Sequence, residues 1–427
     1  MKSYRHIVTA LLHIILLSVF IATPAAAQDE WNGETGFLGV DANMIRGIWV
    51  TRWEYRTTED VTSLMSRAAG YGMTDVFFQV RGRGDAFYRS NLEPWGEELA
   101  GRLGRDPGWD PLEVAIREAH SRGLRLHAWI NTFPIWSGTT LPPATQPEHV
   151  YLKHPEWIMS NRVGSTQRLG NRFGYVSASP ANPEVQDHIQ AVVMDIVGNY
   201  EVDGIHYDYI RLPDHDYSYD AVSRGRFLRE SLSLSYMEFQ ADEITGMLER
   251  IAGSARARRP GLIMTAAIVN RYNRAVGIFA QDPVAWIEGG ALDYVIPMMY
   301  TPSPAEFVDM MNGYREVLPA GRMAAGINLG EMPDDPHAVA GQVHQSLLAG
   351  IRGHVLFSLA NVDDLDRLAS RYDNLYSYLE VLSDADFAEV VQRSPVRLTE
   401  RGREVEGNVT HLVPVVVKTA ILLIFVL

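Results

Sequence analysis

The sequence predicts an α/β fold, a (β/α)8 TIM barrel with a long insertion after its third strand and a short C-terminal extension. Between Arg46 and Leu359, short apolar runs alternate with helical patterns, which is typical of parallel strands joined by crossover helices. This region of roughly 310 residues is close in size to a typical barrel of ~250 residues with insertions. No Gly-x-Gly-x-x-Gly motif opens a helix after the first strand, so the rival doubly wound sheet has less support.

Eight strands are expected, and each is a short run in which apolar and aromatic residues predominate. Such runs suit a parallel sheet, because its strands are buried on both faces. In chain order, the expected strands are 47–53, 75–81, 124–131, 204–211, 262–269, 293–300, 323–329 and 354–359.

Helices are expected between these strands, and several have proline at the start and glycine near the end. Asp110-Pro111 and Asn182-Pro183 each combine an N-cap residue with proline at the first helical position, where its missing N–H is tolerated. The expected helices are 58–71, 111–122, 183–200, 236–258, 283–289, 304–317 and 336–350. The longest interruption, residues 132–179, follows the third strand and is expected to form a lid or a cleft wall at the functional end of the barrel.

The two ends of the chain differ from the barrel region. Residues 1–27 combine a basic start, an apolar run and three alanines, which predicts a cleaved signal peptide and therefore an exported protein, periplasmic or extracellular. A first transmembrane helix is the alternative, but the apolar run is short for a span of about 20 residues. The barrel domain is then expected over 28–372 and a helical, polar extension over 373–411. The hydrophobic tail 412–427 is compatible with a terminal strand, with part of a further domain, or with a weak membrane association.

Composition excludes several classes of function. The chain has no cysteine, which rules out disulfides and thiolate metal sites. The net charge is −14, and the absence of a cluster of Lys and Arg argues against nucleic acid as a partner. No His-x-x-x-His pair lies on an expected helix, so a zinc hydrolase has little support, and no metal or organic cofactor is expected.

The fourth expected strand carries the strongest candidates for chemistry. In Gly204-Ile205-His206-Tyr207-Asp208, alternation places His206 and Asp208 on one face, and Asp208 lies near the carboxyl end, where barrel enzymes carry catalytic side chains. Asp203 at the start of the strand is expected to be structural. The alternative for Asp208 is a buried ion pair with Arg81 that closes the barrel.

The other strand ends offer residues that suit a sugar. Arg81 and Asn131 end the second and third strands, and Tyr300 ends the sixth. Trp53 and Trp129 are expected to stack on sugar rings, whose faces are apolar. Hydrolysis of a glycosidic bond requires a second carboxylate, for which the candidates are Glu331, after the seventh strand, and Asp85, after the second.

Eight stretches of the chain resemble glycosyl-hydrolase-like family 10, whose members include a divisome-localised glycosyl hydrolase. They begin with Arg46-Gly47-Ile48-Trp49-Val50-Thr51, Val76-Phe77-Phe78-Gln79-Val80-Arg81, Asp106-Pro107-Gly108-Trp109-Asp110-Pro111-Leu112 and the run 118–131. They continue with Pro180-Ala181-Asn182-Pro183-Glu184-Val185, the run 203–209, Leu292-Asp293-Tyr294-Val295-Ile296-Pro297 with Tyr300, and Val355-Leu356-Phe357-Ser358. These matches follow the family's order.

The resemblance implies an exported bacterial barrel with glycoside hydrolase activity. Two positions depart from the pattern: Tyr209 stands where some members carry a second Asp, and Ser179-Pro180-Ala181 replaces the usual Asp-Pro-Gly. The fourth strand is also similar to the Asp-Gly-x-Asp-x-Asp-x-Glu run of chitinases, but His206 and Ile210 replace its inner Asp and final Glu. A substrate-assisted mechanism of the chitinase kind is therefore not expected.

We interpret the sequence as an exported glycoside hydrolase that acts on peptidoglycan glycan strands or another polysaccharide by carboxylate acid/base chemistry. Asp208 is the first candidate, and Glu331 or Asp85 is the second carboxylate. Arg81, Asn131, His206 and Tyr300 are expected to orient the sugar, and Trp53 and Trp129 to stack on it. Two other readings stay open: a noncatalytic glycan-binding protein on the same scaffold, and a polysaccharide deacetylase with a bound metal.

Overall fold

The computed structural model describes residues 44–230, 233–333 and 335–361. The predicted signal peptide 1–27, the extension 373–411 and the hydrophobic tail 412–427 lie outside these residues. None of the helices in the described part of the chain is both long and apolar enough to cross a membrane.

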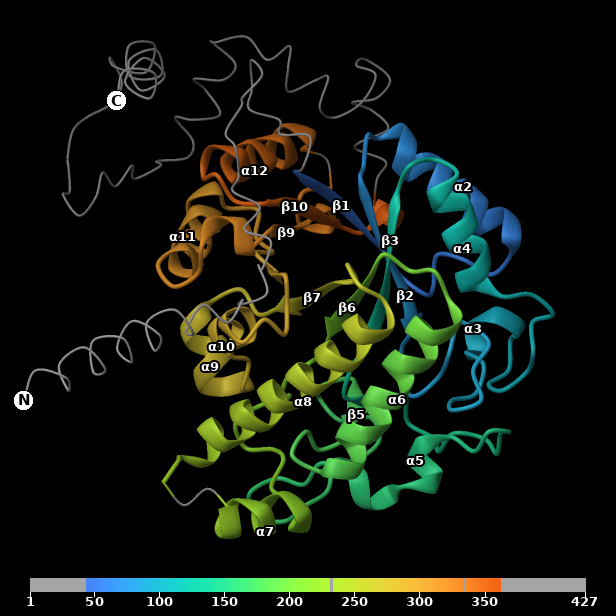
Figure 1. Cartoon of the computed structure of the whole chain (residues 1–427), viewed down its shortest axis with the longest axis vertical. Coiled ribbons are helices and arrows are strands. Elements are labelled where there is room, and N and C mark those ends of the chain that lie inside the picture. Colours follow the sequence, from blue (N-terminus) through green and yellow to red (C-terminus); the bar gives the residue numbers. More distant parts are fainter. Residues whose placement is uncertain (1–43, 231–232, 334, 362–427) are drawn as a thin grey trace, which may run out of the picture. The chain divides into compact units, whose positions relative to one another are not determined.

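Eight parallel strands form the predicted barrel, and their order follows the chain around the sheet (Figure 1). Neighbouring strands are paired in the order β8-β7-β6-β3-β2-β1-β10-β9. Parallel bridges from Val295 to Met323 and from Met298 to Gly326 bring the two outer strands of this list together, so the barrel is nearly closed. The strands are β1 (Ile45–Val50), β2 (Asp75–Arg81), β3 (Arg125–Asn131), β6 (Gly204–Asp208), β7 (Ile263–Ile268), β8 (Tyr294–Pro297), β9 (Ala325–Asn328) and β10 (Gly353–Phe357).

Large side chains from most of these strands fill the barrel interior. Trp49, Phe77, Trp129 and Val355 belong to one buried cluster, so the barrel is a packed core and not a pore. Gly204 leaves room for this packing: a Cβ at that position would lie 2.3 Å from Nδ1 of His127. The lack of a side chain at position 204 therefore avoids a clash with His127.

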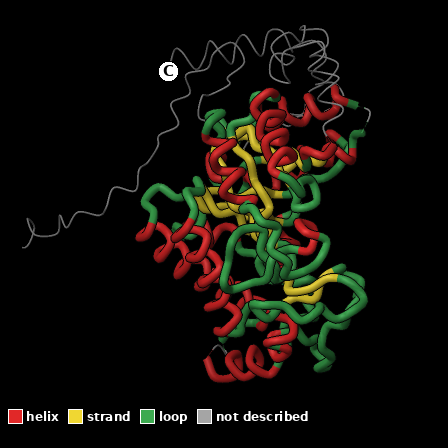
Figure 2. Tube along the Cα trace, turned by 90° about the vertical axis from the view of Figure 1, so that its right-hand side faces the viewer, coloured by secondary structure: helices red, strands yellow, loops and turns green. Residues whose placement is uncertain are grey.

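Helices cover the outside of the barrel (Figures 1 and 2), and the seven expected ones are all present. Asp110 and Asn182 cap their helices as predicted, each accepting a backbone N–H bond from the first turn. These seven are α2 (Thr58–Gly70), α4 (Pro111–His120), α6 (Pro183–Asn199), α8 (Tyr236–Arg258), α10 (Pro283–Glu288), α11 (Pro304–Arg315) and α12 (Pro336–Leu348). The pattern did not predict α3 (Glu97–Ala100), α5 (Val150–Lys153), α7 (Ala221–Glu230) or α9 (Tyr272–Phe279).

The insertion after β3 has structure of its own. Strands β4 (Pro134–Ser137) and β5 (Tyr175–Ser177) form a two-stranded antiparallel sheet, which Figure 2 shows apart from the barrel strands. The insertion also pairs with the segment after β6, where the N–H of Tyr219 donates to Ser160 O at 2.8 Å and that of Arg162 to Asp216 O at 3.0 Å. The insertion and this segment therefore form one wall beside the carboxyl ends of β3 and β6.

Candidate active site

Asp208 ends β6 and lies beside Asn131, its partner in β3. Its backbone carbonyl accepts the N–H of Thr132 at 2.7 Å, and its Oδ1 accepts the N–H of Tyr209 at 2.6 Å. Its side chain is buried but not sealed, with 11% exposure. Burial raises the pKa of Asp208, although Arg211 and the Tyr209 N–H oppose this effect. A carboxyl with a raised pKa at the mouth of a barrel has the properties of a general acid.

The residues after Asp208 turn back over it. Tyr209 has a backbone φ of 48°, in the left-handed region. Nη1 of Arg211 lies 3.4 Å from Oδ1 of Asp208, and the guanidinium carbon lies 4.5 Å from the centre of the Tyr209 ring. The contacts of Tyr209 and Arg211 with Asp208 depend on this turn, so the sequence pattern does not indicate them.

Two other strands bring hydrogen-bond donors toward Asp208. The indole N–H of Trp129 on β3 lies near enough to lower the pKa of Asp208 slightly, but it completes no hydrogen bond with a described residue. Tyr300 follows β8; burial first, and the charge of Asp208 second, raise its pKa well above the ordinary value. Its ring stacks on Phe357 at the end of β10, with the centroids 5.8 Å apart. A phenol with a raised pKa stays protonated, so Tyr300 is a donor.

Asn131 is held by a chain of hydrogen bonds between amide groups across the mouth of the barrel. Its Oδ1 accepts from Nε2 of Gln79 at 3.2 Å, and its Nδ2 donates to Gly82 O at 3.0 Å. Gln79 in turn accepts the N–H of Arg52 at 3.1 Å. Asn131 is therefore beside Asp208 but buried, and its side chain links the ends of β1, β2 and β3.

Arg81 does not pair with Asp208, so the alternative of a barrel-closing ion pair between these two residues is wrong. Its guanidinium forms two parallel bonds with Glu93, of 2.8 Å from Nε and 2.7 Å from Nη2. Nη1 also donates to the backbone carbonyls of Thr132 and Pro134 at the exit of β3. The competing carboxylate lies only twelve residues further along the chain and is as deeply buried as Arg81. Arg81 thus anchors the loops around the site and has no donor directed at a sugar.

His206 lies in the barrel interior below Asp208. Its Nε2 accepts from Nε1 of Trp49 at 3.0 Å, which assigns the proton to Nδ1, 2.9 Å from the Thr265 hydroxyl. Burial, with a further contribution from His127, lowers the pKa of His206 well below its ordinary value. With both nitrogens engaged and the ring fully buried, His206 supports the floor of the site and does not face the mouth.

The two candidates for the second carboxylate lie in different surroundings. Asp85 is completely buried, and its Oδ1 accepts the N–H groups of Gly82 and Arg83. Glu331 is exposed in the short helix 329–331 after β9, and no hydrogen bond or ion pair joins it to a described residue. Within the described part of the chain, neither carboxylate contacts Asp208.

Trp53 is exposed at the exit of β1, as a sugar-stacking residue requires. Its exposed fraction is 56%, and the guanidinium carbon of Arg52 lies 3.9 Å from the centre of its ring. Arg52 itself is buried; it contacts Glu98 and donates to the hydroxyl of Tyr175 on β5 of the insertion. Arg52 and Tyr175 were not predicted, although the position of Arg52 at the end of the first expected strand was a usable signal.

Among the described residues, one group of side chains could hold a metal ion. It consists of His154, Glu156 and Glu184, from the insertion and the first turn of α6. Nδ1 of His154 is already 3.0 Å from Glu156, and Glu184 accepts from the indole of Trp157. None of the three contacts Asp208, so this group does not support metal chemistry at the mouth.

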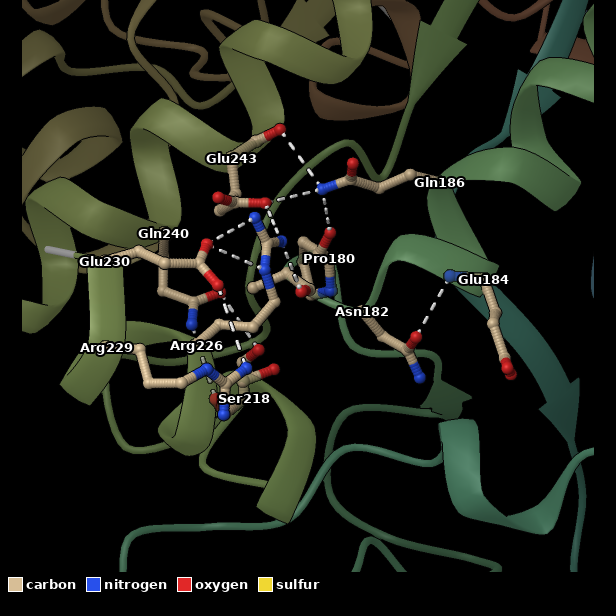
Figure 3. Close-up of polar contacts among 12 residues, drawn as sticks. Pro180, Asn182, Glu184, Gln186, Ser218, Arg226, Arg229, Glu230, Gln240 and Glu243 are labelled. Carbon is tan, nitrogen blue, oxygen red and sulfur yellow. Dashed lines mark hydrogen bonds and ion pairs between the residues drawn. The ribbon is translucent and has the colours of Figure 1, made fainter.

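The segment after Asp208 includes α7, which is fastened to the barrel helices (Figure 3). Arg226 on α7 pairs with Glu230 and with Glu243 on α8, and it donates to Ala181 O at 3.0 Å. Gln186 on α6 bonds Glu243 and Pro180 O. A hollow of about 320 Å³ lies among these helices and another of about 540 Å³ on α2. Neither of these two hollows is lined by a strand-end residue.

The chain is similar to known glycosyl hydrolases. The sequence profile of the family described as Glycosyl hydrolase-like 10 matches residues 44–316. Glycosyl hydrolase DigH of Escherichia coli strain K12 is 27% identical over 308 residues, which cover 60% of this chain and 66% of that protein. Glycosyl hydrolase YngK of Bacillus subtilis strain 168 is 26% identical over 325 residues, covering 69% and 60%. The chain thus spans less than two thirds of the length of these curated relatives.

Solved structures share the fold. The PgaB (BpsB) glycoside hydrolase domain from Bordetella bronchiseptica superposes with a TM-score of 0.59 at 12% identity, over 76% of this chain and 98% of that domain. The α-L-fucosidase isoenzyme 2 from Paenibacillus thiaminolyticus gives a TM-score of 0.55 at 16% identity, over 81% and 50%. At these identities the likeness shows the TIM barrel alone, which agrees with the predicted fold class.

Proposed function

The chain belongs to the Glycosyl hydrolase-like 10 family, and from this premise we propose that it hydrolyses glycosidic bonds of a bacterial cell-wall glycan, with Asp208 as general acid. Family membership implies a glycan substrate. The proposal extends this to peptidoglycan glycan strands or a related polysaccharide, because the similar proteins are bacterial glycosyl hydrolases.

One observation carries the proposal: a buried carboxyl with a raised pKa ends a barrel strand at the mouth. In its protonated form, Asp208 would donate its proton to the glycosidic oxygen as the bond to the anomeric carbon breaks. In a retaining reaction the carboxylate that remains would then take a proton from the attacking water, whereas in an inverting reaction the second carboxylate would take that proton. Tyr300, which stays protonated beside Asp208, would donate to a sugar hydroxyl or carbonyl oxygen, whereas the buried indole of Trp129 would act through Asp208 and not on the sugar.

The second carboxylate is assigned from accessibility. Glu331 is exposed and makes no hydrogen bond or ion pair with a described residue, whereas Asp85 is fully buried and accepts two backbone N–H groups. We therefore place Glu331 ahead of Asp85 as the base or nucleophile. The distance between the carboxyl groups in a substrate complex decides the stereochemistry: about 5 to 5.5 Å implies retention and about 6.5 to 9.5 Å implies inversion.

The glycan would lie across the exits of β1, β3, β6 and β8. Trp53 presents an open ring face for stacking, and Tyr300 and Asn131 flank Asp208. Arg81 and His206 act from beneath, since both are buried and fully engaged. We further propose that the protein is exported to the periplasm or the cell surface through residues 1–27, and that residues 412–427 provide at most a weak membrane contact.

The test measures the release of reducing ends from denuded peptidoglycan and from a panel of polysaccharides. Wild type is compared with Asp208→Asn and with Asp187→Asn, a control on the exposed face of α6. We expect turnover by wild type and control, and a loss of at least 100-fold in Asp208→Asn, the usual size of an acid/base effect.

Two other outcomes would replace the proposal. Binding of glycan by wild type without any release of reducing ends would identify a glycan-binding protein. Release of acetate together with stoichiometric zinc in the purified protein would identify a deacetylase.

A further inference from the structure

The chain bends directly after Asp208, and the bend brings a positive charge to the carboxylate. Tyr209 adopts the left-handed conformation, with φ of 48°, although it is not glycine. Its N–H donates to Oδ1 of Asp208 at 2.6 Å, and Nη1 of Arg211 lies 3.4 Å from the same oxygen. One oxygen of Asp208 thus has two contacts from the three residues that follow it.

Arg211 is held in this position by aromatic packing. Its guanidinium carbon lies 4.5 Å from the centre of the Tyr209 ring, within the range of a cation–π contact. Tyr175 of β5 also contacts that ring, edge-on at a centroid distance of 5.1 Å. The Tyr175 hydroxyl accepts from Arg52 at the exit of β1. The insertion therefore contacts Tyr209, the residue whose ring packs on Arg211.

We propose that Arg211 is the positioning residue that controls the charge state of Asp208, and that Tyr175 of the insertion keeps it there by bracing Tyr209. This inference rests on the proposed function and deepens it, because it names the group that sets the protonation of the acid. It also gives the insertion a chemical task in addition to forming a wall.

The groups that face Asp208 come from four elements. The segment after β6 contributes Arg211 and Tyr209, and the segment after β8 contributes Tyr300. Trp129 and Asn131 of β3 are uncharged, and His206 on β6 itself is neutral. In the part of the chain that the structure describes, Arg211 is the one cation paired with Asp208; Arg52 lies beyond Tyr209.

These surroundings place two opposing influences on Asp208. Burial favours the protonated carboxyl, and Arg211 favours the carboxylate. After Asp208 gives its proton to the leaving oxygen, Arg211 stabilises the carboxylate until it takes a proton from water.

The experiment measures the titration of Asp208 directly in the full-length protein. Aspartate is labelled with ¹³C at Cγ, and the signal of Asp208 is identified by its loss in Asp208→Asn. We expect Arg211→Gln to raise the titration midpoint by about one pH unit, and Arg211→Lys to restore most of the wild-type value, because an adjacent cation lowers such a pKa by 1 to 3 units. Tyr175→Ala should raise the midpoint in the same direction, by less. Arg229→Gln on exposed α7 is the control and should change nothing.

Each result has a definite meaning. A midpoint unchanged in Arg211→Gln, or equal in Arg211→Lys and Arg211→Gln, overturns control by charge. A midpoint unchanged in Tyr175→Ala overturns the bracing by the insertion. The titration needs no turnover, so it stands even where the hydrolysis assay is negative. Where turnover is observed, the limb of the pH profile that disappears in Asp208→Asn should move to higher pH in Arg211→Gln by the same amount.

Discussion

Replacing Glu93 with Gln should destabilise the barrel strongly, because it removes the partner of a buried cation. Arg81 and Glu93 have fully buried side chains, and their two parallel bonds measure 2.8 and 2.7 Å. His188 adds a third contact to Glu93 at 2.9 Å. Removal of one member of a buried pair leaves an unpaired charge and costs about 3 to 5 kcal/mol. We expect a loss of that size in the free energy of unfolding at pH 7.

The assay is urea unfolding followed by tryptophan fluorescence, with Arg117→Met as control in an exposed pair with Glu118, which should change stability by less than about 0.5 kcal/mol. A double-mutant cycle with Arg81→Met and Glu93→Met separates the pair from its members, and the double variant should lose less than the sum of the single ones. Burial acts to raise the pKa of Glu93, but Arg81 and His188 outweigh it and lower the pKa. The stability from Glu93 is therefore present above pH ~4.3 and is lost as the pH falls. A loss below about 1 kcal/mol in Glu93→Gln would refute the reasoning.

Three further changes test other parts of the structure. Gly204→Ala places a Cβ 2.3 Å from His127 Nδ1 and 2.7 Å from the backbone oxygen of Ile263, so we expect a loss of about 1 to 3 kcal/mol in urea unfolding, and no loss would contradict the crowding. Trp53→Ala removes an exposed ring, so KM for glycan should rise several-fold at constant stability; an unchanged KM would show that Trp53 does not stack. Burial first, and His127 second, lower the pKa of His206, so unfolding takes up a proton below pH ~6.5. The free energy of unfolding therefore decreases as the pH falls below that value. The slope of stability against pH between 5 and 6.5 should be smaller in His206→Gln, and an equal slope would contradict a neutral His206.

The strands and most helices could be predicted because their signals are local. Apolar runs flanked by turn residues marked all eight strands, and Asp110-Pro111 marks a helix start through bonds within four residues. The antiparallel pair of β4 and β5 was missed because these two strands are 3 to 4 residues long and lie far apart in the sequence. A pair that distant leaves no periodic pattern.

The candidate site was predicted in part. Alternation along a strand located Asp208 at the mouth and put His206 on the same face, but it did not tell depth, and His206 proved to be fully buried. An ion pair between Arg81 and Asp208 was the alternative to a catalytic role for Asp208. The loop after β2 supplies Glu93 instead, and the path of a loop follows from tertiary contacts.

The sequence by itself determined the barrel, the order of its strands and the position of one carboxyl at a strand end, since these depend on hydrophobic period, helix caps and the alternation of side chains. Only the tertiary structure decided which charges meet. Arg211 reaches Asp208 because Tyr209 adopts a left-handed backbone conformation, and Tyr175 reaches Tyr209 because the insertion packs against the segment after β6. Ion pairs and ring contacts act over a few ångströms, so their partners are chosen by the closure of the chain and not by its local pattern.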